Sequence, residues 1–345
     1  MNLPVQVGKY ELQQLLGRGH YASVYAANDM LLDRTVALKL VILENPTDPQ
    51  ELISRLSEAV LQNRSQHRNV VQVHEVNLVP TPEGQAVGIA MDLVRGGSLQ
   101  DRIAAKFLSA HDCILYFRDV IMGLEYLHTC HIIHRDIKPS NILLSQDRAK
   151  LSDFGLAGIV CVGQALSGEA YVTHKAPECF QMEYSYDVLT DIYALGMTLF
   201  RCVNNVRDWR DRLSRIPDVE TKLQQGQIVE RIGFEPYVPR ELTKIVAKAT
   251  APDRSKRYQS VVDMQRSLNA LRLSLDWHPL GDLLHWKAQG CSQKNKTDSY
   301  LLSISGTTVT LTRNGRRLGE YPKHYATPGA ALAAAYEYIA STTID

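Results

Sequence analysis

Apolar and polar positions divide the chain into a strand-rich first part and a helix-rich middle part. Alternating or β-branched residues, separated by Gly, Asn and Asp, predict strands over residues 10–16, 23–28 and 35–42. After the helix-disfavouring stretch 45–49, residues 51–62 place apolar side chains three or four apart, which predicts one helix. We therefore expect a small sheet with a single helix up to about residue 80.

Helical spacing dominates from Ser98 onward. The clearest run has apolar residues at steps of three or four, at Ile114, Phe117, Ile121, Leu124 and Leu127. A further helix is predicted over residues 261–273. No stretch approaches the ~18 uninterrupted apolar residues that cross a bilayer, and the start of the chain lacks the pattern of a signal peptide or anchor. We expect no membrane association.

A change in composition near residue 275 predicts a domain boundary. The helical pattern gives way to Asp276-Trp277-His278-Pro279 and then to a polar stretch, so residues 275–290 are predicted to be a linker. Beyond it, residues 301–311 alternate weakly and Asn314-Gly315 is a strong hairpin signal. Residues 328–340 form an Ala-rich helical pattern that opens with proline. Residues 291–345 are thus expected to form a small α+β accessory domain.

Composition and charge narrow the class of protein. The 345 residues suit about two domains of ~150 residues each, and 45% hydrophobic with 22% charged residues fits disorder, collagen and coiled coil badly. With 38 Lys and Arg against 37 Asp and Glu, the net charge of +1 argues against a nucleic-acid partner. The six cysteines are scattered without a C-x-x-C pair, which favours reduced thiols and a cytoplasmic location.

Two early features have both a structural and a functional interpretation. Gly17 and Gly19 lie where a strand turns back, so backbone amides there can approach a polyphosphate, but an ordinary glycine hairpin fits equally well. Lys39 lies in an apolar strand pattern and, taken alone, fits an edge-strand lysine that reaches solvent. Neither feature decides the function by itself.

Three later motifs, in order along the chain, give these features a context. They are His134-Arg135-Asp136-Ile137-Lys138-Pro139-Ser140-Asn141, then Asp153-Phe154-Gly155, then Ala176-Pro177-Glu178. Together with the glycine loop and the strand lysine, they resemble the signature set of the eukaryotic-like, bacterial-type Ser/Thr protein kinases. The resemblance covers about residues 8–274, whereas the last ~60 residues resemble no known family.

The resemblance implies a bilobal α+β protein-kinase fold followed by the small accessory domain. An N-lobe over residues 8–91 would hold an antiparallel sheet of five strands plus one helix, and a helical C-lobe would span residues 95–274. ATP and Mg²⁺ would bind between the lobes, with Mn²⁺ able to replace Mg²⁺. The implied activity is transfer of the ATP γ-phosphate to Ser or Thr hydroxyls of a protein substrate, with autophosphorylation in the activation segment.

The resemblance also assigns the chemical roles. Lys39 would hold the α- and β-phosphates and pair with a helix carboxylate, for which Glu58 matches the family pattern and Glu51 is the weaker candidate. Asp136 would be the catalytic base, and Lys138 would neutralise the γ-phosphate. Phosphoryl transfer needs such residues because its catalysis is mainly positioning and charge neutralisation.

Cofactor binding is implied for two further sets. Asn141 and Asp153 would be the Mg²⁺ ligands, since oxygen donors suit this hard cation. The residues expected around ATP come from the glycine loop, two strands and the hinge: Leu16, Gly17, Arg18, Gly19, His20, Tyr21, Ala22, Val24, Ala37, Lys39, Met91, Asp92 and Val94.

Other landmarks have structural or regulatory roles in the family. Glu178 and Arg257 would form a buried pair that ties the activation segment to the helical lobe, and Asp191 would support the catalytic-loop backbone. Arg135 would meet a phosphate on the activation segment. The remaining residues of this group are Phe154 and Gly155 of the metal motif and the candidate phosphoacceptors Ser167, Tyr171 and Thr173.

Two positions depart from the family pattern. Ala22 replaces the third glycine of the loop with another small residue. In the stretch before Ala176, the usual Thr position is held by Tyr171, and Thr173 comes two residues late. We therefore expect an unusual substrate-facing loop.

Alternative interpretations stay open. His128, Cys130, His131 and His134 crowd together and suggest zinc, although the kinase pattern already accounts for two of them. The alternative function is a pseudokinase scaffold, which the complete catalytic set argues against. The tail 287–345, with seven Lys or Arg against four Asp or Glu, suggests recruitment of a substrate or partner. The substrate's identity and the oligomeric state are left open.

Overall fold

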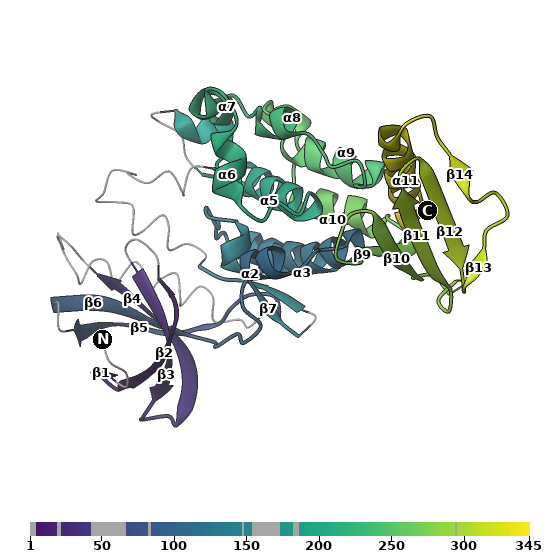
Figure 1. Cartoon of the computed structure of the whole chain (residues 1–345). Coiled ribbons are helices and arrows are strands. Elements are labelled where there is room, and N and C mark those ends of the chain that lie inside the picture. The colour runs from purple at the N-terminus through teal and green to yellow at the C-terminus, as the bar shows by residue number, and fades with distance from the viewer. Residues whose placement is uncertain are drawn as a thin grey trace.

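The computed structural model describes residues 5–18, 22–42, 67–81, 84–146, 148–153, 173–181, 186–293 and 295–345. Three units follow one another along the chain: a lobe built on a sheet, a helical lobe, and a second sheet backed by one helix (Figure 1). Within the described part of the chain, none of the helices is both long and apolar enough to cross a membrane.

The N-terminal lobe is built on a six-stranded antiparallel sheet with the strand order β1-β2-β3-β4-β6-β5. Its strands are β1 (Val5–Val7), β2 (Tyr10–Arg18), β3 (Ala22–Asp29), β4 (Arg34–Ile42), β5 (Val73–Thr81) and β6 (Gly84–Met91). The three strands predicted from alternation are confirmed as β2, β3 and β4. The expectation of five strands is wrong because residues 5–7 pair with residues 10–12 and bury Val7. The predicted helix over 51–62 lies outside the described residues.

The two faces of this sheet bury different residues. One face packs Tyr10 and Leu38 into a core of the lobe itself. The other face packs Ala37 and Met91, and Leu143 from the helical lobe contacts this second cluster. The second face is therefore the one that meets the helical lobe.

The second lobe is mainly helical. Its elements are α2 (Leu99–Ala105), α3 (Ala110–Thr129), the hairpin β7 (Ile142–Ser145) and β8 (Arg148–Leu151), α5 (Val188–Val203), α6 (Trp209–Ser214), α7 (Val219–Gln224), α8 (Ile228–Ile232), α9 (Arg240–Ala249) and α10 (Val261–Asn269). Single 3₁₀ turns cover Pro139–Asn141, Pro177–Phe180 and Arg254–Lys256. The predicted apolar face of α3 is confirmed, because its five residues are wholly buried.

The connection between the lobes is held by close backbone packing. A Cβ atom on Gly96 would lie 2.1 Å from the Leu144 carbonyl oxygen, so this position requires glycine. Ser98 then caps α2 by accepting from the Asp101 amide at 3.1 Å. The strand that ends the N-terminal lobe is thereby fixed against β7 of the helical lobe.

The last unit begins earlier than its composition predicts. Its sheet contains β9 (Leu275–Pro279), β10 (His285–Gly290), β11 (Ser299–Ser305), β12 (Thr308–Arg313), β13 (Arg316–Arg317) and β14 (Lys323–His324), and α11 (Pro328–Thr343) covers one face. The predicted linker over 275–290 is wrong, because Leu275, Trp277, Trp286 and Ala288 point to the buried face of this sheet. The polar residues between them alternate onto the other face.

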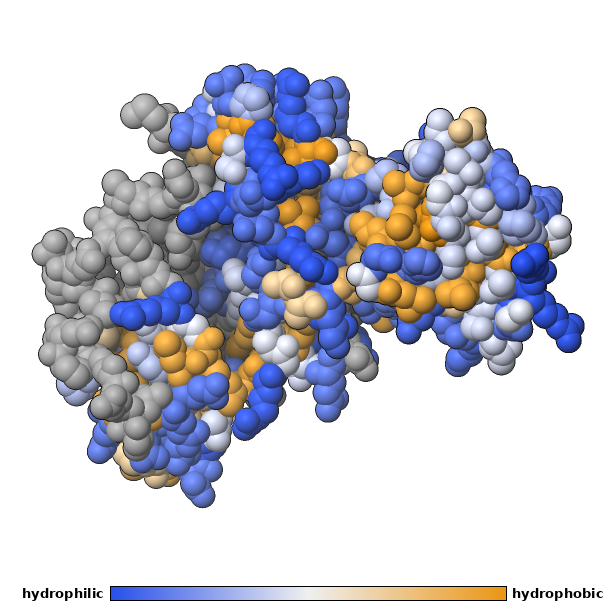
Figure 2. Space-filling view, viewed as in Figure 1, coloured by the Kyte–Doolittle hydropathy of each residue, from blue (hydrophilic) through white to orange (hydrophobic). Residues whose placement is uncertain are grey.

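Local signals in this unit agree with the structure. The Asn314-Gly315 turn joins β12 to β13 with φ angles of 51° and 75°, as a primed hairpin turn requires. Pro328 opens α11 behind the N-cap Thr327, which confirms the predicted helix. Figure 2 shows hydrophobic residues at the surface of this unit, where the exposed large apolar side chains are Leu280, Leu283, Leu284 and Leu301.

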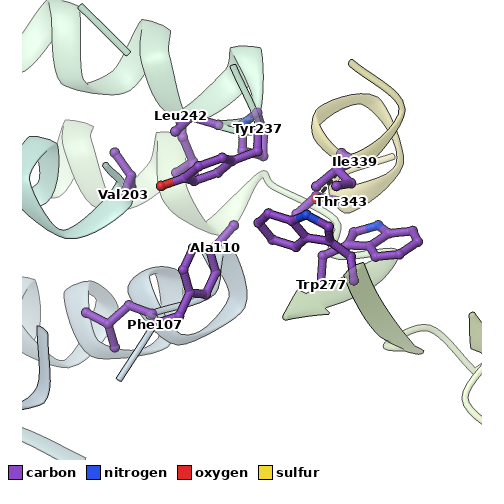
Figure 3. Close-up of a pocket in the computed structure, with 12 residues that line it drawn as sticks. Phe107, Ala110, Val203, Tyr237, Leu242, Trp277, Ile339 and Thr343 are labelled. Atoms are coloured by element: carbon purple, nitrogen blue, oxygen red, sulfur yellow. Dashed lines mark hydrogen bonds between the residues drawn. The ribbon is translucent and has the colours of Figure 1, made fainter. Parts of the chain in front are cut away.

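The C-terminal unit packs against the helical lobe through aromatic side chains. The wholly buried Trp286 ring lies 5.4 Å from Phe107 and 5.5 Å from Tyr237, measured between ring centres. These residues border a small cavity between the two units (Figure 3). The chain end also returns here, since Leu273 pairs with Ile344. The helix α10 ends at Asn269 instead of the predicted residue 273.

Candidate active site

The predicted catalytic loop is anchored by one buried carboxylate from α5. Asp191 accepts hydrogen bonds from the backbone amides of His134 and Arg135, both at 2.8 Å. Its Oδ2 also lies 2.9 Å from Nε2 of His128 on α3. Arg135 has a φ of 71°, a left-handed conformation that these contacts hold in place. Asp191 therefore fixes the backbone next to Asp136.

Three predicted site residues meet within this loop. Asp136 Oδ2 lies 2.7 Å from Lys138 Nζ and 2.8 Å from Asn141 Nδ2. Asn141 Nδ2 donates a second bond, at 2.8 Å, to the Asp136 carbonyl. The carboxylate is thus held beside a cationic side chain, in an orientation suited to accepting a proton from a nearby hydroxyl.

A second contact joins the two lobes. Lys39 Nζ on β4 lies 2.6 Å from Oδ1 of Asp153, and both side chains are partly exposed, at 17% and 26%. Glu58 and Glu51, the carboxylates predicted as partners of Lys39, lie outside the described residues. Asp153 has a φ of 59°, which is uncommon for a residue with a side chain.

The two predicted metal ligands are connected through the backbone. Ser152, next to Asp153, donates its amide at 2.9 Å and its hydroxyl at 3.1 Å to the Asn141 carbonyl. Since the Asn141 amide nitrogen points to Asp136, its side-chain oxygen is on the other side of the amide group. A carboxylate and an amide oxygen are the donors that Mg²⁺ takes from proteins, so the residues fit this cation.

The predicted adenine site is an apolar cluster that both lobes share. Ala22, Val24 and Val94 pack against the cluster that contains Ala37 and Met91. Leu143 of β7 joins them from the helical lobe, and sequence reasoning missed it. The signal available was its place two residues after Asn141, within a short apolar strand.

The remaining residues predicted to contact ATP are more exposed to solvent. Leu16, Gly17 and Arg18 end β2 with exposed side chains or backbone. Asp92 begins the connection to the helical lobe, and its amide donates to the Gln72 carbonyl at 2.9 Å. Its carboxylate lies 3.0 Å from His74 Nε2 and 3.6 Å from Lys150 Nζ. Asp92 thus links His74 on β5 to Lys150 on β8.

The segment after residue 172 is tied to the helical lobe. Arg257 donates two hydrogen bonds to Glu178, at 2.6 and 2.8 Å, and both residues are buried. Thr173 Oγ1 lies 3.1 Å from Nδ1 of its neighbour His174. The Arg135 guanidinium lies 5.9 Å from the centre of the Tyr186 ring. Besides Glu58, the predicted site residues that lie outside the described residues are Gly19, His20, Tyr21, Phe154, Gly155, Ser167 and Tyr171.

Two of the histidines that suggested zinc, His128 and His134, have other partners. His128 contacts Asp191, and the buried His134 accepts from the Asp136 amide at 3.3 Å through Nδ1. Burial lowers the pKa of His134, although Asp191, Asp136 and Asp153 oppose this effect, so the ring is neutral at pH 7. Both histidines therefore support the catalytic loop.

Comparison with known proteins agrees with this geometry. Residues 10–268 match the family model described as "Protein kinase domain". The chain belongs to the protein kinase family, and the resemblance to its bacterial Ser/Thr members is confirmed.

Three bacterial relatives illustrate the similarity. The chain is 30% identical over 303 residues to the probable serine/threonine-protein kinase PknB of Bifidobacterium longum, covering 82% of this chain and 43% of the relative. It is 31% identical over 288 residues to PknH of Mycobacterium tuberculosis (80% and 44%) and 29% identical over 266 residues to PrkC of Bacillus subtilis (76% and 40%). The chain thus spans less than half the length of these curated relatives.

Proposed function

We propose that this chain is a serine/threonine protein kinase that uses ATP and Mg²⁺ to phosphorylate a protein substrate. The observation that carries the proposal is the contact of Asp136 with Lys138 and Asn141 in one loop, beside Asp153. The names of its relatives, which are serine/threonine-protein kinases, support the same activity.

In the proposed reaction Asp136 accepts the proton of a substrate Ser or Thr hydroxyl. The hydroxyl oxygen then forms a bond to the γ-phosphorus of ATP, and the bond between that phosphorus and the β–γ bridging oxygen breaks, with ADP as the leaving group. Lys138, 2.7 Å from Asp136, offsets the charge on the γ-phosphate oxygens.

Asn141 and Asp153 would hold Mg²⁺, which when bound supplies further neutralisation of phosphate charge. Lys39 would hold the α- and β-phosphates. The apolar cluster of Ala37, Met91 and Leu143 would receive the adenine ring.

A scaffold function is the second candidate, and the Lys39–Asp153 contact favours it. The lysine needed for the phosphates and the carboxylate needed for the cation neutralise each other at 2.6 Å. An active kinase must add the ATP phosphates and Mg²⁺ to this pair, whereas a scaffold can keep the pair as it is. Nucleotide binding and phosphoryl transfer therefore have to be measured separately.

The deciding experiment uses the full chain with γ-labelled ATP and Mg²⁺, beside Asp136→Asn. Label on Ser or Thr in the wild type alone would support kinase activity and autophosphorylation. Mapping the labelled residues would then test the three predicted phosphoacceptors, Ser167, Thr173 and Tyr171. If neither the chain nor added proteins take up label while ATP binds normally, the scaffold function replaces the kinase.

The proposal extends to cellular setting and partners. The five cysteines in the described residues are free thiols, which supports a reducing cytoplasmic compartment. Residues 287–345 form most of a folded unit beside the helical lobe, and we propose that they recruit a substrate or partner. Deleting this unit without loss of phosphorylation of the native substrate would remove that part of the proposal.

A further inference from the structure

A group of buried nitrogen-bearing side chains lies where the segment after residue 172 meets α5 and α6. It consists of Arg201 in the last turn of α5, Trp209 at the start of α6, and His174. Their exposed fractions are 4, 8 and 7%. The Arg201 guanidinium carbon lies 5.1 Å from the centre of the Trp209 ring, and the rings of His174 and Trp209 are 5.8 Å apart. We call these three residues the donor cluster.

Each member of the donor cluster has a buried nitrogen without a hydrogen-bond partner among the described residues. These atoms are Arg201 Nε, Trp209 Nε1 and His174 Nε2. The first two can only donate. Burial, with Arg201 and Lys138, holds the pKa of His174 well below its usual range, so its ring is neutral. When Thr173 donates to Nδ1 at 3.1 Å, Nε2 carries the proton and becomes a third donor.

The hydrogen-bond partner of the charged Arg201 side chain among the described residues is a neutral amide. Arg201 Nη2 donates to the amide oxygen of Gln100 at 2.7 Å, and none of the ion pairs between described residues includes this arginine. Cys202 and Asp208 raise the pKa of Arg201 against the larger effect of burial, and the Asp208 carboxylate caps α6 by accepting from the Asp211 amide. Burial lowers the pKa of Arg201 to about 10, so the guanidinium stays charged at neutral pH. A buried charge and unpaired donors are costly unless an anionic acceptor meets them.

The donor cluster adjoins the catalytic loop. His174 and Lys175 line a cavity together with Asp136 and Arg135. In Figure 1, α2, α5 and α6 lie in the part of the helical lobe nearer the N-terminal sheet, and the Arg201–Gln100 bond joins two of them. His174 is the member of the donor cluster that borders this cavity, so an anion held beside His174 would lie next to a polypeptide whose hydroxyl is at Asp136.

Resting on the proposed kinase activity, we propose that the donor cluster binds an acidic side chain of the protein substrate. This kinase then selects Ser or Thr flanked by Asp or Glu over the same residue flanked by Lys or Arg. A carboxylate accepts several hydrogen bonds at once, and such bonds are strong to a guanidinium in a site from which water is excluded. Lys175 and Arg135 line the same cavity, whose two carboxylates already have partners, Asp136 in Lys138 and Asp191 in the catalytic-loop amides.

The test compares three peptides that share one Ser and differ only in the flanking residues, which are Glu, Gln or Lys. Binding to the full chain is measured by fluorescence polarisation with a non-hydrolysable ATP analogue, and phosphorylation is measured with ATP. We expect the Glu peptide to bind about tenfold more tightly than the Gln peptide, which is the size of one charge-assisted hydrogen bond. The Lys peptide should bind most weakly.

Variants locate the effect. Arg201→Gln should raise KM for the Glu peptide about tenfold with little change in kcat or in KM for ATP. Arg201→Glu should reverse the order and favour the Lys peptide, and Trp209→Phe, which keeps the ring and removes Nε1–H, should have a smaller effect. The matched control is Arg210→Gln, an exposed arginine beside Trp209. Circular dichroism confirms that each variant is folded.

The outcomes separate the inference from the function on which it rests. Equal binding of the three peptides, or a preference that Arg201→Gln and Arg201→Glu leave unchanged, overturns the acidic site. If the Glu peptide binds selectively but no peptide is phosphorylated, the proposed kinase activity fails while the acidic site stands. If both Arg201 variants unfold, the acidic site is judged from the ranking of the three peptides in the wild type and from the effect of Trp209→Phe on that ranking.

Discussion

Arg257 and Glu178 form a two-pronged ion pair inside the helical lobe, with Nη1–Oε1 and Nη2–Oε2 distances of 2.6 and 2.8 Å. The residues are 79 positions apart in the chain. Arg257 also donates to the Ala251 carbonyl at 2.6 Å and lies over the Tyr193 ring. The pair therefore connects the segment that ends at Glu178 with the core around α5.

Removing one member of this pair should destabilise the protein strongly. Arg257→Met leaves the buried Glu178 carboxylate with only the more distant Arg254, at 3.5 Å, so we expect the free energy of unfolding to fall by about 3–5 kcal/mol. Urea denaturation followed by circular dichroism measures this change. The control is Arg266→Gln, whose side chain is 76% exposed beside Asp263, and it should change stability by less than about 0.5 kcal/mol. Similar losses in the two variants would contradict a structural role for the pair.

Replacing the proposed base should affect chemistry and leave nucleotide binding in place. Asp136→Asn keeps the side-chain shape and its contacts but cannot accept the substrate proton at neutral pH. We expect phosphorylation to fall by about 10²–10⁴-fold, the usual contribution of a general base. Label transfer from ATP measures the rate, and titration with a fluorescent nucleotide measures binding. A variant that retains most of the wild-type rate would exclude Asp136 as the base.

Mg²⁺ and ATP should stabilise the protein through Asp153. At a concentration 100 times Kd, a ligand that binds only the folded state adds about 2.7 kcal/mol, so the melting temperature of the wild type should rise. Asp153→Asn should lose most of this rise, because it removes the charged ligand predicted for the cation. Asp33→Asn, in the exposed turn between β3 and β4, is the control and should respond like the wild type. An equal rise in both variants would remove Asp153 from the cation site.

Truncating the Trp286 side chain should weaken the packing of the C-terminal unit on the helical lobe. The Trp286 side chain, on β10, is wholly buried against Phe107 and Tyr237. Trp286→Ala should lower the free energy of unfolding by about 3–5 kcal/mol. Leu301→Ala on the open face of the same sheet, where the side chain is 42% exposed, should cost less than about 1 kcal/mol. Thermal unfolding measures both changes. Equal costs would mean that the C-terminal unit is not packed on the helical lobe through Trp286.

His278 should make stability depend on pH near neutrality. Its hydrogen bond to Asp276, at 3.0 Å, raises the pKa of His278 against the opposing effect of burial, with Asp112 adding to the rise and Lys287 reducing it. A raised pKa in the folded state stabilises below the ordinary value of about 6.5, and this stabilisation is lost as pH rises through the folded-state pKa.

Because the His278 side chain is 34% exposed, its contribution should stay below about 1 kcal/mol. Stability measured by urea unfolding from pH 6 to 8 should therefore fall less in His278→Gln than in the wild type. His324→Gln, an exposed histidine on β14, is the control and should follow the wild-type curve. If wild type and His278→Gln give parallel curves, the pair with Asp276 does not contribute to the pH dependence.

Much of the catalytic region is determined locally. The alternation in β2, β3 and β4 and the buried stripe of α3 are properties of single elements, because each periodicity places one face of one strand or helix in a core. The motif 134–141 brings Asp136, Lys138 and Asn141 together within one turn of chain. Those residues could therefore be predicted as a group before any tertiary contact was known.

Other features depend on contacts between distant parts of the chain. Asp191 meets the amides of residues 134 and 135 only because α5 packs beside α3, and Leu143 reaches Ala37 only because the lobes meet. The strands β9 and β10 resemble a linker in composition, since their polar residues face outward and their apolar partners lie on α11 and the helical lobe. The pattern of one segment specifies which side is apolar but not which distant surface covers it.

The sequence by itself determined the kinase family, the group of residues proposed for phosphoryl transfer and the order of the three units. Only the tertiary structure decided that Lys39 contacts Asp153, that the last unit starts at Leu275, and that Arg201, Trp209 and His174 share one buried site. The physical reason is that motifs and periodicity act over a few neighbouring residues. Burial, charge pairing and unpaired donors arise where segments far apart in the chain come together.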